Sequence, residues 1–178
     1  MGFFDFMNDW AEKTRKNSEL QKQKAELNKK VAIYEFEKPQ LQKINAESAQ
    51  IIENTKDLKV AMGRFDTIRN NCGRLLTLNP HGTPVPISIG KWVTNSEAAT
   101  YQEIMVHIEK AKRAYTQSFY TNKINAEILK ADHLTDTKLK KTQLRKALKA
   151  ALDSSVKLPK DPVVQGLIVE IEGKLTKA

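Results

Sequence analysis

Apolar and small residues recur in steps of four and three along two long stretches of this chain. The first run begins at Ile44 and ends at Leu76, with Arg69 as its one charged member. The second run begins at Tyr101 and ends at Leu129. This spacing places the residues of each run along one face of an α-helix. The sequence therefore predicts two long helices, each with a narrow apolar stripe that needs a partner helix.

A segment that is rich in proline and glycine separates the two runs and spans residues 79–95. Its prolines restrict the preceding backbone to extended conformations. The residues from Ile87 to Val93 alternate weakly and favour a short strand pair or an ordered loop. Two helical stripes around one breaker predict an elongated, coiled-coil-like antiparallel hairpin, in which residues 40–78 pack against residues 96–131.

Polar, strongly helix-forming sequence precedes this hairpin. The apolar stripe of residues 13–38 is thin, so this helix also needs a partner. Pro39 either kinks the helix or begins a new one, and from there we expect helix to about Leu78. Asn95 or Ser96 is the expected cap of the next helix.

Two shorter helices are predicted after the hairpin. Residues 137–155 follow a cap at Thr135 or Asp136, and a last helix begins at Pro162 with Asp161 as its cap. We therefore predict an all-α protein with an amphipathic N-terminal helix (1–18), a long hairpin (19–131) and C-terminal helical segments (132–178). The expected inward-facing residues of the last two helices are Leu139, Leu144, Leu148, Leu152, Val163, Val164, Leu167, Ile168, Ile171 and Leu175.

Net positive charge is concentrated in one part of the chain. The formal net charge is +9, and residues 110–149 hold eleven basic and three acidic residues. This concentration indicates a local anionic partner. The single cysteine, Cys72, lies on the apolar stripe and is interpreted as a small core residue, so no internal disulfide is possible.

Motifs of catalysis and cofactor binding are absent from the sequence. The three histidines lie in three different segments, and no zinc-protease, P-loop, dinucleotide-binding or nucleophile-elbow pattern occurs. We expect neither an enzyme nor a bound metal or cofactor. No run of apolar residues has the length of a membrane span, and the N-terminus does not resemble a signal peptide, so a cytoplasmic protein is expected.

Basic residues recur at helical spacing in the segment KLKKTQLRKALK. Lys138, Lys141, Arg145 and Lys149 share one helical face. This face could bind phosphates of lipid head groups or of nucleic acid, could bind an acidic protein, or could simply be solvated. Because no recognition-helix motif or zinc finger accompanies it, nucleic-acid binding would be independent of base sequence.

The N-terminal residues form a second candidate binding surface. Phe3, Phe6, Met7 and Trp10 share a helical face, with acidic and amide residues on the other side. Three interpretations stay open for this face. It could lie in a membrane interface, insert into a partner's groove, or pack back onto the hairpin.

The start MGFFDFM, followed by a long basic helical hairpin, resembles the PspA/ESCRT-III-type membrane-remodelling proteins. The resemblance is architectural and covers residues 1–131 loosely. It implies a non-enzymatic helical protein that polymerises on membranes. This chain departs from the family at residues 79–95, where family hairpins turn tightly, and at Pro39 in the first helix. No functional residue is transferred from the family.

The leading hypothesis is a non-catalytic helical protein that forms homo-oligomers and docks on an anionic surface, most readily the inner face of a membrane. Thin apolar stripes favour self-association, because exposed stripes need cover. One alternative is a sequence-nonspecific nucleic-acid-associated protein of phage or plasmid type. Another is an adaptor or inhibitor of one protein partner, with Trp92 in the segment 79–95 as the contact residue. Trp92 could equally pack the end of the hairpin.

Overall fold

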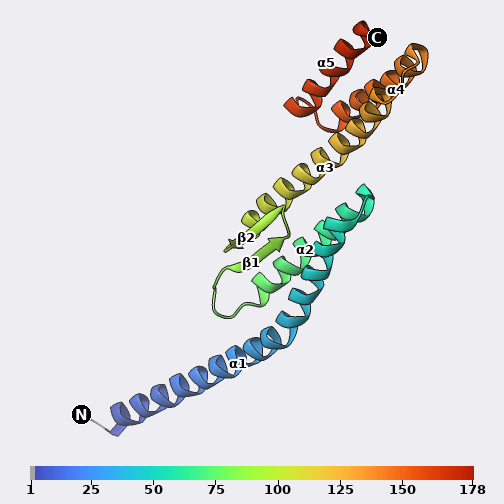
Figure 1. Ribbon diagram of the computed structural model, residues 1–178. Coiled ribbons are helices and arrows are strands. Elements are labelled where there is room, and N and C mark those ends of the chain that lie inside the picture. Colours follow the sequence, from blue (N-terminus) through green and yellow to red (C-terminus); the bar gives the residue numbers. More distant parts are fainter. Residues whose placement is uncertain (1–2) are drawn as a thin grey trace. The chain divides into compact units, whose positions relative to one another are not determined.

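The structure is a computed structural model that describes residues 3–178, apart from the side chains of residues 3–6 and 9. The described chain is predominantly helical, which confirms the all-α prediction (Figure 1). The elements in chain order are α1 (Phe3–Asn54), α2 (Leu58–Leu78), β1 (Val85–Ile89), β2 (Val93–Ala98), α3 (Tyr101–Asp132), α4 (Thr137–Lys157) and α5 (Pro162–Lys177).

The chain divides into two compact units, each formed from two stretches of sequence. Residues 1–53 and 63–108 make up the first unit, which contains most of α1 and α2, the strand pair and the start of α3. Residues 54–62 and 109–178 make up the second, which contains the rest of α3 together with α4 and α5. Each unit has its own buried residues and is described by itself.

Helix does not run unbroken to Leu78, contrary to the prediction. It stops at Asn54 and restarts at Leu58, so α1 and α2 are joined by a three-residue break. Asp57 caps the new helix, because its Oδ1 accepts hydrogen bonds from the backbone N–H groups of Lys59 (2.8 Å) and Val60 (3.1 Å). The apolar spacing continues across the break, and for this reason periodicity alone did not reveal it.

Polar contacts join α1 to α2 in the first unit. The guanidinium of Arg74 donates to both carboxylate oxygens of Glu37, at 2.9 and 2.8 Å. The side-chain amide of Asn71 donates to Asn45 Oδ1 at 2.9 Å, and Asn45 donates to the sulfur of Cys72 at 3.6 Å. Residues 40–54 therefore pair with residues 63–78 instead of forming one rod with them.

Pro39 lies inside α1 and does not begin a new helix. Proline removes one backbone hydrogen bond and its ring crowds the preceding turn, so it bends a helix that continues through it. Figure 1 shows α1 changing direction in this region. Of the two alternatives offered by the sequence, the kink is the one observed.

The Pro/Gly-rich segment contains an antiparallel strand pair, β1 and β2. Alternate residues of β1 are buried, namely Val85, Ile87 and Ile89. Asn95 and Ser96 belong to β2, so the prediction that one of them caps a helix was wrong. The cap is instead Thr100, whose hydroxyl accepts from the N–H of Glu103 at 3.2 Å, while Glu103 accepts from Ala99 N–H at 2.7 Å.

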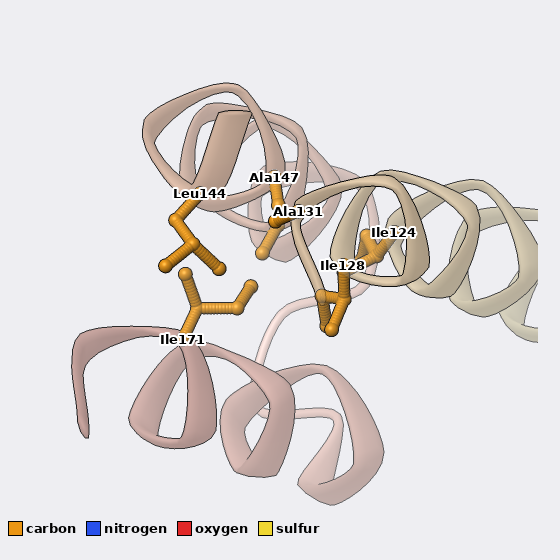
Figure 2. Close-up of a cluster of buried hydrophobic side chains, with 7 residues drawn as sticks. Ile124, Ile128, Ala131, Leu144, Ala147 and Ile171 are labelled. Carbon is orange, nitrogen blue, oxygen red and sulfur yellow. The ribbon is translucent and has the colours of Figure 1, made fainter. Parts of the chain in front are cut away.

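Small apolar side chains form the core of the second unit. Figure 2 shows Leu144 of α4 and Ile171 of α5 pointing toward each other, with Ala147 beside Ala131 of α3. Asp136 caps α4 and Asp161 caps α5, as the sequence predicted. The expected inward faces were only partly correct, because Leu139 (57% exposed), Leu152 (48%) and Val163 (43%) face outward.

Candidate functional site

The predicted basic residues lie together on the outer face of α4. We call Lys138, Lys141, Arg145 and Lys149 the α4 basic stripe. Lys141 is half-buried and the other three are exposed. The buried residues of the same helix recur at similar spacing on the opposite side: Leu144, Ala147, Ala151 and Ser154. Packing of the small residues onto α3 and α5 thus directs the stripe away from the core of the unit.

The stripe keeps its charge uncompensated. None of its four side chains forms an ion pair within the described part of the chain. Several acids of this unit pair with cations outside the stripe. The Lys130 ammonium bonds to Glu127 and lowers the pKa of that carboxyl group, and Lys174 does the same for Asp132. Four cationic side chains are therefore free to bind an external anion.

Two exposed aliphatic residues extend the stripe toward the end of α4. Leu152 is 48% exposed and Val156 is 76% exposed. They follow Lys149 by three and seven residues, so they lie on the same helical face. The outer face of α4 is thus cationic along most of its length and apolar near its C-terminal end.

A small recess adjoins the stripe between α3 and α4. Its volume is about 180 Å³, and its lining includes Tyr120, Lys123, Lys146, Lys149 and Asp153. Three ammonium groups outnumber the one carboxylate in this lining. The recess is smaller than the pockets of roughly 300–1,000 Å³ that are typical for organic ligands.

The N-terminal candidate surface is only partly described. The side chains of Phe3 and Phe6 lie outside the described residues. Met7 is 47% exposed and Trp10 is 60% exposed, on a segment that is helical from Phe3 onward. Neither Met7 nor Trp10 is therefore buried against the first unit.

Trp92 lies in the turn between β1 and β2 and is half-buried. Its backbone N–H donates to the carbonyl of Ile89 at 3.0 Å. The ammonium of Lys91 lies 4.8 Å from the centroid of its indole ring, at the distance of a cation–π contact. Burial and this contact reduce the ring surface that a partner could reach.

A recess in the first unit was not foreseen from the sequence. It has a volume of about 440 Å³, and its lining includes Asn45, Glu53, Ile68, Cys72 and Ser88. Burial raises the pKa of the Cys72 thiol to about 11, so the thiol stays protonated at neutral pH and is a poor nucleophile.

Comparison with known proteins gives no assignment. No protein-family model matches the chain, and neither a curated protein nor a solved structure is significantly similar to it. Within the described residues, no three His, Cys, Asp or Glu side chains are grouped to hold a metal. None of the described helices combines the length and the hydropathy needed to cross a membrane.

Proposed function

We propose that this protein is a non-catalytic helical interaction protein that self-associates and docks on an anionic surface through the outer face of α4. The observation that supports the proposal is the α4 basic stripe, with four cationic side chains that no described carboxylate neutralises. Like charges along one face repel each other in the free protein, and an anionic partner relieves that repulsion.

A membrane is the leading candidate for this surface. Leu152 and Val156 continue the stripe with exposed aliphatic side chains. A lipid surface accepts both features, because phosphates attract the lysines and the acyl boundary accepts the aliphatic groups. The phosphate backbone of a nucleic-acid duplex attracts the lysines but offers no apolar environment for Leu152 and Val156. The resemblance to PspA/ESCRT-III-type proteins points in the same direction, and the exposed Trp10 provides a second apolar contact near the N-terminus.

The proposal is tested by sedimentation of the full-length protein with vesicles of phosphatidylcholine and phosphatidylserine, with vesicles of phosphatidylcholine alone, and with duplex DNA. We expect binding to the anionic vesicles that persists at moderate salt. The double variant Lys141→Glu/Arg145→Glu should lose most of it. Lys22→Glu/Lys29→Glu is the matched control, since it changes the net charge equally at exposed positions of α1.

Equal binding by the stripe variant and the control would exclude the α4 basic stripe as the docking surface. Binding to DNA but not to vesicles, with a steep dependence on salt, would instead support the nucleic-acid alternative. If the protein binds neither vesicles nor DNA, a protein partner is the remaining alternative. Replacing Phe3 and Trp10 by Ala should reduce vesicle binding, and unchanged binding would remove the N-terminal segment from the proposal.

A further inference from the structure

The covered residues of α1 follow a seven-residue repeat. Between residues 31 and 52, every position of this repeat is buried or half-buried. Asn45 is one of these positions, and it bonds to Asn71 and Cys72 of α2. The repeat is therefore the line along which α1 contacts the rest of the first unit. Its members are Val31, Tyr34, Lys38, Leu41, Asn45, Ser48 and Ile52.

The same repeat continues toward the N-terminus, where no described residue buries it. Every described side chain from residue 10 to residue 30 is exposed. Leu20 and Leu27 are each 49% exposed and Trp10 is 60% exposed. We call the uncovered positions of the repeat from residue 13 onward the α1 seam, and they are Lys13, Asn17, Leu20, Lys24 and Leu27. Trp10 belongs to the N-terminal candidate surface.

A helix whose side chains are all exposed to solvent gains little stability when no other helix packs against it. The ion pairs that α1 makes here, such as Lys16 with Glu12 at 2.7 Å, contribute about 0.2–0.5 kcal/mol each. Helices in water depend mainly on the burial of an apolar face. The α1 seam is the face that continues an interface already formed, so it is the face that a partner helix would cover.

We propose that the α1 seam binds the α1 seam of a second copy, in a parallel two-stranded coiled coil. This proposal deepens the self-association part of the proposed function and rests on it. It does not depend on the anionic surface. Leu20 and Leu27 are seven residues apart and take the d positions of a dimeric heptad. Asn17, Lys24 and Val31 take the a positions.

The flanking charges are compatible with a parallel orientation. In a parallel pair, Lys30 lies opposite Glu35 of the second copy, and Lys16 lies opposite an uncharged Gln21. An antiparallel pair would place Lys16 near Gln23 or near Lys30 of the second copy, depending on its register. Asn17, and not charge, therefore decides the orientation. The parallel orientation also brings the two N-terminal ends together, so that two anchors meet one surface and bind it with greater avidity.

Two polar positions limit the strength of the dimer and set its register. Asn17 at an a position pairs well only with itself, which selects a parallel dimer with matched ends. Lys24 at the next a position must extend its ammonium to the solvent at the edge of the interface. The dimer is therefore expected to dissociate on dilution, and Lys24→Leu should strengthen it by about tenfold or more.

Sedimentation velocity of the full-length protein in the absence of vesicles and DNA tests the interface. We expect a monomer–dimer equilibrium that the double variant Leu20→Asp/Leu27→Asp abolishes. Ile33→Asp/Phe36→Asp is the matched control, because these exposed residues of α1 (45% and 69%) lie off the seam. A monomer at all concentrations, or equal loss of the dimer in both variants, would overturn the proposal.

Disulfide cross-linking tests the orientation. Lys24→Cys should link two copies under mild oxidation, because equivalent a positions of a parallel pair lie within disulfide reach and this variant keeps Asn17. Lys22→Cys, on the opposite side of the helix, is the control. The native Cys72 does not interfere, since it is fully buried. A dimer in which neither cysteine cross-links would overturn the parallel register.

The two proposals can fail separately. If the seam variant is a monomer that binds anionic vesicles, but more weakly than the wild-type protein does, docking through α4 stands and the seam contributes avidity. If the wild-type protein is a dimer that binds no vesicle or nucleic acid, the seam stands and the proposed docking surface is wrong. A monomer that binds vesicles as tightly as a dimer would exclude a role of the seam in docking.

Discussion

The two units of this protein use polar groups differently in the contacts between their helices. In the first unit, Asn45, Asn71 and the Glu37–Arg74 ion pair join α1 to α2 beside an apolar core that includes the fully buried Phe65. In the second, small and branched apolar side chains of α3, α4 and α5 meet in a cluster, and Ser154 and Asp161 are buried elsewhere in this unit. Charged pairs such as Asp132 with Lys174 lie only at the edge of the cluster.

This difference indicates how polar and apolar contacts contribute to stability and to the register of the helices. A buried or half-buried polar contact contributes little net stability but penalises every register that leaves a group unpaired. A cluster of alanines and isoleucines contributes stability through close packing but discriminates less between registers. We infer that the polar contacts specify the register of α1 against α2, and that truncating a buried side chain of the apolar cluster in the second unit leaves a destabilising cavity.

The largest expected effect is in the apolar cluster. Leu144→Ala removes a fully buried side chain between α4 and α5 and should lower the free energy of unfolding by about 2–5 kcal/mol. Leu139→Ala, on the same helix but 57% exposed, is the control and should change it by less than about 1 kcal/mol. Denaturant unfolding monitored by circular dichroism measures both, and similar effects would contradict the assigned inner face of α4.

A smaller effect is expected at the turn that joins the strands of the first unit. Gly90 has a φ of +49°, and a Cβ there would lie 1.8 Å from the Glu53 carboxylate. Gly90→Ala should therefore cost about 1–3 kcal/mol, from backbone strain and displacement of Glu53. Gly82→Ala is the control, since its φ is +63° but its Cβ would meet nothing within 4 Å. Equal destabilisation would mean that backbone strain alone limits Gly90.

The smallest effect concerns the charged edge of the second unit. Bonding to Lys174 lowers the pKa of Asp132, so the pair stabilises the folded state above about pH 4 and this contribution disappears as the pH falls through the lowered pKa. Both side chains are partly exposed, which limits the contribution to less than about 1 kcal/mol. Asp132→Asn should slightly reduce the loss of stability at acid pH. An unchanged loss of stability at acid pH in Asp132→Asn would show that the ion pair is negligible.

Much of the helical architecture could be predicted because its signals are local. Asp136 and Asp161 were identified as caps from the residues that follow them, and both accept bonds from the helix N-terminus. Cys72 was expected in the core because it lies on an apolar stripe, and it is fully buried. The α4 basic stripe was identified by spacing on one helix, which depends on no distant residue.

Other features could not be predicted, because they depend on which distant residues meet. Leucine spacing pointed Leu139 and Leu152 inward, but the observed core uses Ala147 and Ala151, since α3 and α5 approach α4 closely only on that side. The recess beside Asn45 depends likewise on Pro86 and Ser88 of β1, which are far away in sequence.

The sequence by itself determined that the protein is helical, where most helices begin, and that positive charge gathers on one face of α4. These properties follow from backbone propensity, capping and helical spacing, which act over a few residues. Asp57 is a local capping signal for the start of α2, but only the tertiary structure decided that the chain turns back at residues 55–57 so that α1 pairs with α2. The hydroxyl of Tyr115 donates to the carbonyl of Thr55 at 3.0 Å, and this bond holds the turn against a helix that is distant in sequence. Such a contact exists only in the folded chain, because it requires residues 60 positions apart to meet.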